Sequence, residues 1–211
     1  MADGRERAGG GRRRPTPAEV SAAGGRLLPD VIRPGLLVLF CGINPGLYSA
    51  AAGHHFARPG NRFWKALQLA GFTPGLLAPE QDGELPDHGL GVTNLVDRAT
   101  AGAAELSPGE LRAGAAALAA KVEAARPAWV AFLGIGAYRV AFAAPAAAVG
   151  PQPGPLGGAR VWVLPNPSGR AAHYQLPDLV VAFAALRRAA LPPSGGPATS
   201  AAPGCRPVGP A

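Results

Sequence analysis

Two Asn-Pro pairs, each placed directly after an apolar run, carry the clearest chemistry in this chain of 211 residues. The motif GINPG spans residues 42–46, and the motif PNPSGR spans residues 165–170. Asparagine offers both a donor and an acceptor, which suits recognition of the edge of a neutral base. Proline disfavours the helical region for the residue before it, so the Asn44 side chain can project from a strand end. Taken alone, GINPG is better explained by a turn in which Asn forms local hydrogen bonds. A second Asn-Pro after a second strand is harder to dismiss, because both would face the same crevice.

Between these motifs lies HHFARPGNRFW, residues 54–64, which combines an aromatic ring with His and Arg. A nucleobase stacks well on such a ring, so Phe56 is a candidate for binding a base. The alternative of equal weight is that Phe56 packs as a plug on top of a sheet. His54 and His55 are adjacent, but no third ligand follows at the spacing of a zinc site, so we predict no metal.

The elements that position these motifs are short apolar runs that alternate with helical patterns. We predict strands at 36–43, 89–96, 128–135 and 159–164, and helices at 61–71, 107–125, 136–143 and 177–190. Continuously apolar strands separated by helices are typical of a parallel sheet that is covered on both faces. The predicted fold class is therefore α/β, a three-layer α/β/α sandwich around a mostly parallel sheet of four to five strands. Ligands bind beyond the carboxyl ends of such strands, where both Asn-Pro motifs lie.

The composition excludes several classes of protein. Cys41 and Cys205 are the only cysteines, which excludes a disulfide framework and any four-cysteine zinc or iron–sulfur site. No apolar stretch of about 18 residues lacks Gly, Pro or charge, and the N-terminus has no apolar signal segment. We therefore expect a cytoplasmic protein without membrane association. The formal net charge of +7 suits a polyanionic partner.

The chain divides into a tail, one folded domain and a second tail. We expect residues 1–17, which are rich in Arg and Gly, and residues 192–211, which are rich in Pro, Gly and Ala, to be disordered. The single domain then spans residues 18–191. The first tail is either a solvated extension or a basic arm that adds non-specific affinity for phosphates.

Taken together, four segments resemble the mismatch-specific uracil-DNA glycosylases, a branch with bacterial G·U mismatch glycosylases and thymine-DNA glycosylase. These segments are GINPG, ARPGNRFWKALQLAGFT, GVTNLVDRAT and VWVLPNPSGR, and the resemblance covers roughly residues 30–190. It implies a monomeric, cofactor-free enzyme of base excision repair that acts on double-stranded DNA at the bacterial nucleoid. The enzyme would flip out uracil opposite guanine, and more weakly thymine or modified cytosine. It would then hydrolyse the N-glycosidic bond and leave an abasic site.

The resemblance also implies a role for each motif residue. Asn44 would position the attacking water, while Phe56 stacks on the flipped base and Asn166 faces the base or the sugar–phosphate. Main-chain groups of Gly42 and Ile43 would bind the base. The loop that enters the DNA would comprise Ser168, Gly169 and Arg170. Bacterial mismatch glycosylases usually have Leu where Arg170 stands, whereas thymine-DNA glycosylase has Arg.

Two residues after the second strand have several possible roles. We favour Asp97 as the partner of Arg98 or as a helix cap; alternatively, it supplies the carboxylate that GINPG lacks and acts as an additional base. Asn94 is expected to contact a backbone phosphate. No lysine lies in the motifs, which argues against an imine-forming lyase.

Two other functions stay open from the sequence. A neutral Asn cannot take a proton from water as a carboxylate does, so a base-flipping lesion sensor with negligible turnover is one alternative. A hydrolase of free nucleosides is the other, and Arg170 in an exposed loop argues for DNA instead.

Overall fold

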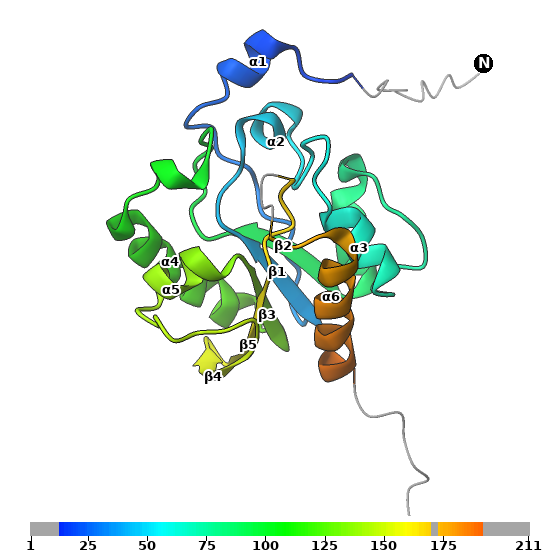
Figure 1. Ribbon diagram of the computed structural model, residues 1–211, viewed down its shortest axis with the longest axis vertical. Coiled ribbons are helices and arrows are strands. Elements are labelled where there is room, and N and C mark those ends of the chain that lie inside the picture. Colours follow the sequence, from blue (N-terminus) through cyan, green and yellow to red (C-terminus); the bar gives the residue numbers. More distant parts are fainter. Residues whose placement is uncertain (1–12, 170–172, 192–211) are drawn as a thin grey trace, which may run out of the picture.

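Five strands form one central sheet in the computed structural model, which describes residues 13–169 and 173–191 (Figure 1). The strand order is β2-β1-β3-β5-β4. The strands are β1 (Val38–Gly42), β2 (Leu90–Asn94), β3 (Trp129–Leu133), β4 (Gly150–Leu156) and β5 (Ala159–Leu164). All pairings are parallel except that of β4 with β5. The predicted α/β class with a mostly parallel sheet is confirmed.

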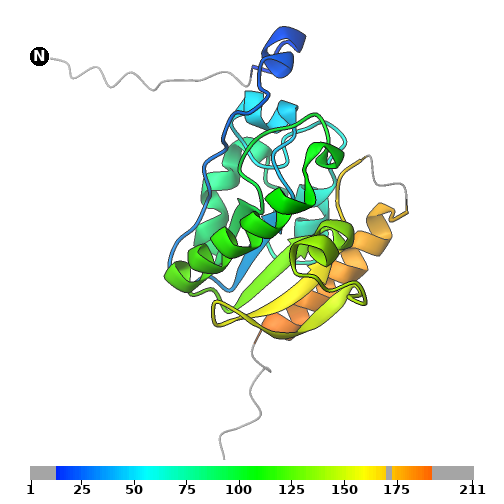
Figure 2. The ribbon, with the colours of Figure 1, turned by 90° about the vertical axis from the view of Figure 1, so that its left-hand side faces the viewer.

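Helices cover both faces of this sheet, because its inner strands are apolar on both sides. Every residue of β1, β2 and β3 is buried. Within β1, Phe40 belongs to the core beneath α3 (Phe63–Leu69) and α6 (Leu176–Ala190). Leu39 belongs to the opposite core, beneath α4 (Pro108–Ala125) and α5 (Ile135–Ala141). Figure 2 shows α4 and α5 lying across the face of the sheet that is turned toward the viewer.

Helices α3, α4, α5 and α6 correspond to the four helices that the sequence predicts. The helices are α1 (Pro17–Ser21), α2 (Leu47–Ala52), α3 (Phe63–Leu69), α4 (Pro108–Ala125), α5 (Ile135–Ala141) and α6 (Leu176–Ala190), with 3-10 helices η1 (Pro79–His88) and η2 (Ala103–Glu105). Helix α4 begins at the expected capping box, in which the Ser107 hydroxyl accepts from the Glu110 amide and the Glu110 carboxylate accepts from the Ser107 amide. Within residues 13–169 and 173–191, the helices are too short or too polar to span a lipid bilayer.

Three features differ from the expected elements. Strand β4 has the sequence GPQPGPL, which carries no strand pattern, and it is tolerated because it pairs along one side only, at the edge of the sheet. Helix α2 begins directly after GINPG, where no helix was expected. The boundary expected between residues 17 and 18 falls within α1, which Thr16 caps. The rest of the first tail, residues 1–12, and residues 192–211 lie outside the described residues.

Candidate active site at the carboxyl ends of the strands

A cavity of about 310 Å³ lies at the carboxyl ends of β1, β2, β3 and β5. Its size is at the small end of ligand cavities, which suits a single base. Its lining includes residues at the ends of these strands and residues of the segment between the two Asn-Pro motifs. Among them are Gly42, Ile43, Asn44, His55, Phe56, Arg58, Asn61, Asn94, Leu133, Asn166 and Ser168. The structure therefore brings together most of the residues that the sequence predicted for the site.

Asn44 is held in one orientation by the loop that follows β2. Its Nδ2 donates to the main-chain oxygen of Arg98 at 3.1 Å and to Oγ1 of Thr100 at 2.7 Å. The Thr100 hydroxyl donates in turn to the carbonyl of Gly102 at 2.9 Å, so it acts as an acceptor toward Asn44. Because carbonyl and hydroxyl acceptors surround Nδ2, Oδ1 is the atom that can accept a hydrogen bond from a water in the cavity.

Phe56 serves both the core and the cavity. Its ring stacks on Phe63 with 4.1 Å between ring centroids and an interplanar angle of 29°, and it also lines the cavity. The backbone of Phe56 has a φ of 54°, a left-handed conformation that is rare for an aromatic residue. Such conformations persist where the surrounding structure enforces them, often at ligand sites. The two roles weighed for Phe56, a plug on the sheet and a wall for a base, are compatible.

Asn94 lies in the wall of the cavity rather than at its rim. Its side chain is 4% exposed, and within the described part of the chain its Nδ2 has no hydrogen-bond partner. The neighbouring strand ends at Gly42, where a Cβ would lie 2.6 Å from the Asn94 Oδ1, so glycine makes room for this amide. A buried amide without a partner is costly, which points to a ligand that completes its hydrogen bonds. This placement differs from the expected contact with a backbone phosphate.

Asn166 and the residues after it form a tight turn at the end of β5. The Asn166 Oδ1 accepts from the Ser168 amide at 2.9 Å, which leaves Nδ2 as the donor that Asn166 can present to the cavity. At Gly169, a Cβ would lie 2.8 Å from the carbonyl oxygen of Gly60, so the turn packs closely on the preceding segment. Arg170 lies outside the described residues.

Asp97 does not line the cavity, and its partner is neither Arg98 nor a helix terminus. Its Oδ1 lies 3.0 Å from Nζ of Lys121, which also binds Asp30 at 2.8 Å. Burial lowers the pKa of Lys121, but the hydrogen bonds to the two carboxylates outweigh burial and raise it. Arg98 pairs instead with Glu110 at 2.6 Å. Asp97 is therefore not the partner of Arg98, and it lies outside the cavity in which an additional base would act.

The two adjacent histidines support the segment that carries Phe56. The buried His55 ring binds the carbonyl of Pro29 through Nε2 at 2.9 Å, while Asp82 binds the His55 amide and the His54 ring. Burial lowers the pKa of His55, so the ring is neutral and its Nε2 is the donor. Among the described residues, no group of three or more His, Cys, Asp or Glu side chains could hold a metal ion.

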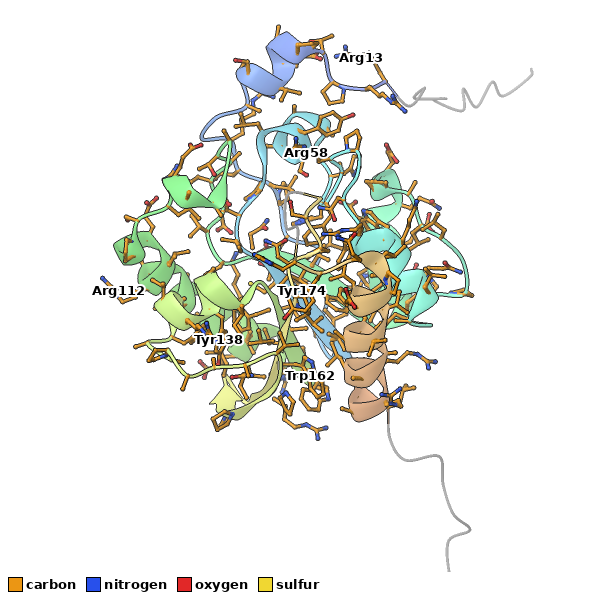
Figure 3. All side chains as sticks on the ribbon, viewed as in Figure 1. Arg13, Arg58, Arg112, Tyr138, Trp162 and Tyr174 are labelled. Atoms are coloured by element: carbon orange, nitrogen blue, oxygen red, sulfur yellow. The ribbon has the colours of Figure 1, made fainter. Side chains whose placement is uncertain are left out.

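A second cavity of about 1050 Å³ adjoins the first and shares Phe56, Arg58 and Asn61 with it. Its lining includes Lys65 and also Arg13 and Arg14, which sequence analysis had assigned to a disordered tail. Cationic side chains therefore gather in the cavity that adjoins the smaller one. One of them, Arg58, is labelled close to α2 in Figure 3. This distribution suits a phosphate backbone that passes the site.

Thr100 lines the cavity and contacts Asn44, but the sequence did not indicate it as a site residue. It belongs to GVTNLVDRAT, but no role followed from its type or its spacing. The signal is its hydrogen bond to Asn44, which joins residues 56 positions apart and exists only in the folded chain.

A comparison with protein families identifies the family of this chain. The model of the uracil DNA glycosylase superfamily matches residues 29–187. That range contains the strands, the Asn-Pro motifs and every residue lining the smaller cavity except Leu28. Since the match spans well over half of the chain, the protein belongs to the uracil DNA glycosylase superfamily, a family of DNA glycosylases.

Proposed function

We propose that this protein is a mismatch-specific uracil-DNA glycosylase of base excision repair. It removes uracil, and more weakly thymine or modified cytosine, from opposite guanine in double-stranded DNA. It is monofunctional, uses water as the nucleophile and leaves an abasic site. The observation that carries the proposal is the orientation of Asn44, whose Nδ2 is bound by Arg98 and Thr100 while Oδ1 is left to accept from a water.

The cavity offers a uracil complementary contacts on its face and its edge. Phe56 provides an aromatic surface for stacking. The Asn94 amide carries one donor group and one acceptor, which matches the O4 acceptor and N3–H donor of uracil. Asn166 supplies a second amide donor, and the main chain of Gly42 and Ile43 lies alongside.

In the reaction, the C1′–N1 bond breaks and N1 keeps its electron pair, while the water oxygen bonds to C1′. The proton released by the water can pass to the departing base anion. Preorganised donors stabilise that anion as it forms. No carboxylate lines the cavity among the residues that the structure describes, so Asn44 orients the water without deprotonating it. Bond cleavage is then slow, and selectivity rests on base flipping, which costs least at a mismatch.

Arg170 is proposed to fill the gap left by the flipped nucleotide and to contact the unpaired guanine, with Ser168 and Gly169 forming the base of its loop. This role rests on the resemblance of VWVLPNPSGR to the glycosylases. No lysine lines the smaller cavity in the described ranges, which supports hydrolysis without an imine intermediate. We further propose that the protein acts as a monomer on bacterial chromosomal DNA.

A lesion sensor with negligible turnover is the second candidate, and the lack of a carboxylate in the described lining of the cavity favours it. Purified protein incubated with a labelled G·U duplex, followed by alkali, distinguishes the candidates. Strand breakage only after alkali indicates a monofunctional glycosylase, while breakage before alkali indicates a lyase. Tight binding without breakage supports the sensor, and release of uracil from deoxyuridine alone supports a nucleoside hydrolase.

A further inference from the structure

We propose that Arg62 is a positioning residue that fixes both ends of the loop after β5, and that it promotes base flipping in duplex DNA rather than cleavage of the glycosidic bond. The inference rests on the proposed glycosylase function. Arg62 does not line the base cavity, so it acts through the loop.

The Arg62 side chain spans two stretches of main chain that are distant from it in sequence. Its Nε donates to the Pro167 carbonyl at 3.3 Å and its Nη2 to the Ser168 carbonyl at 2.7 Å. Its Nη1 donates to the Tyr174 carbonyl. The Arg62 amide adds a bond to the Pro167 carbonyl at 3.0 Å. Only the planar, five-donor guanidinium can reach these acceptors together; an ammonium group has no such fork.

These acceptors lie on both sides of the predicted DNA-entering residue. Pro167 and Ser168 follow β5, and Tyr174 precedes α6, near whose start Figure 3 labels it. Arg62 is also the N-cap residue of α3, whose residue Phe63 stacks on Phe56. Arg62 therefore links three parts of the fold: the end of β5, the segment before α6, and helix α3, which carries the ring that stacks on Phe56.

Close packing of glycines reinforces this link. A Cβ on Gly169 would lie 2.8 Å from the Gly60 carbonyl oxygen, so the loop after β5 and the segment before α3 touch through their backbones. Asn61 and Ser168, one from each segment, both line the cavity. The contacts that hold the ends of the loop after β5 therefore also set the distance between the segments that carry Asn61 and Ser168.

The two steps of the reaction should respond differently to loss of Arg62. Asn44 is oriented by the loop after β2, which Arg62 does not touch in any of the contacts above, so cleavage of an already exposed uracil should be preserved. Flipping from a duplex needs the loop after β5 in place, because that loop must occupy the stack as the base leaves it. Substitution of Arg62 should therefore separate single-stranded from double-stranded substrates.

The test uses the full chain with Arg62→Lys and Arg62→Ala, and with Arg112→Ala as the control. Arg112 is exposed on α4, and Figure 3 shows it on the outer side of the molecule, so its loss removes the same charge away from the site. Under single-turnover conditions, Arg62→Lys should lower uracil excision from a G·U duplex by about tenfold or more, as for the loss of a charge-assisted hydrogen bond. Its rate on single-stranded uracil DNA should match that of Arg112→Ala. An equal loss on both substrates would overturn the proposal.

A second measurement does not depend on activity. Chymotrypsin cleaves after Tyr174, whose carbonyl is the one that Arg62 binds and whose side chain is 37% exposed. Cleavage there should be faster in Arg62→Lys than in the wild type and in Arg112→Ala. Unchanged cleavage would show that Arg62 does not hold this end of the loop. If the wild type excises no uracil, the proposed function fails, and the cleavage rate still decides whether Arg62 positions the loop.

Discussion

At the scale of single residues, the site depends on a neutral side chain whose orientation is set by a neighbour. Thr100 gives Asn44 its shortest contact, 2.7 Å, and thereby keeps Nδ2 away from the cavity. We predict that Thr100→Val lowers the rate of uracil excision by about tenfold, since the amide loses a fixed acceptor. Because the defect lies in bond cleavage, single-stranded and duplex substrates should be affected alike.

Thr73→Val provides the matched control for this prediction. Thr73 is also buried and also donates to a carbonyl, that of Gly75 at 2.9 Å, but it does not line the base cavity. If Thr73→Val and Thr100→Val lose the same activity, the loss reflects general destabilisation rather than the orientation of Asn44.

His55 makes the stability of the site sensitive to acid. Burial lowers the pKa of His55, and this outweighs the opposing hydrogen bond to Pro29 and the nearby carboxylates of Asp82 and Asp30. In the window below the unfolded value of about 6.5, the unfolded chain binds a proton that the folded chain does not, so stability falls as the pH falls. We predict that His55→Gln, which keeps a donor for the Pro29 carbonyl, loses less stability in this window than the wild type.

Urea unfolding at about pH 7.5 and about pH 5.5 measures this difference, because the first value lies above the unfolded pKa of about 6.5 and the second lies below it. His54 and Asp82 are retained in both proteins, so the comparison isolates the ring of His55. Parallel losses of stability in the two proteins would show that the buried ring is not the acid-sensitive group.

At the scale of elements, the N-terminus of α4 connects helix stability to the loop after β2. The Glu110 carboxylate accepts from the Ser107 amide and hydroxyl and also binds Nε of Arg98, whose own carbonyl holds Asn44. The hydrogen bond from Arg98 is the largest cause that holds the pKa of Glu110 at about 2, so this side chain is ionised at neutral pH. One residue thus serves as a helix cap and supports the site.

Two substitutions separate these roles. Ser107→Ala should reduce the free energy of unfolding by about 1 kcal/mol, as for the loss of a helix cap, and leave uracil excision unchanged. Glu110→Ala should reduce stability and also slow excision, because Arg98 loses its ion pair. Thermal unfolding and single-turnover rates of both variants check this, and equal activity of the two variants would exclude the connection through Arg98.

The sequence predicts an element well where its signal is local. Strand β1 follows from one continuous apolar run, and α4 from its cap, its Pro and its Glu within four residues. By contrast, β4 is a strand only because β5 lies beside it, and nothing in GPQPGPL indicates this. The site shows the same limit. Its Asn-Pro residues were found from sequence, whereas the bond from Lys121 to Asp97 joins residues 24 apart that only the fold brings together.

At the scale of the whole molecule, the fold gathers neutral amide side chains from three strand ends in one cavity. Asn44, Asn94 and Asn166 line the cavity, and asparagine amides need no cation to orient water or bind a base. We predict that excess EDTA leaves uracil excision from a G·U duplex unchanged. Activity that disappears with the chelator and returns with Zn²⁺ or Mg²⁺ would mean that the site has been misinterpreted.

We propose that a water oriented by Asn44 cleaves the glycosidic bond in the cavity at the carboxyl ends of the strands. The most direct test compares wild type with Asn44→Ala in uracil excision from a G·U duplex and in binding to an abasic duplex. We predict that the substitution removes most turnover while abasic-site affinity stays close to that of the wild type, because we expect DNA binding to rest on other residues. Turnover and affinity that fall by the same factor would contradict it and make Asn44 a residue of the scaffold.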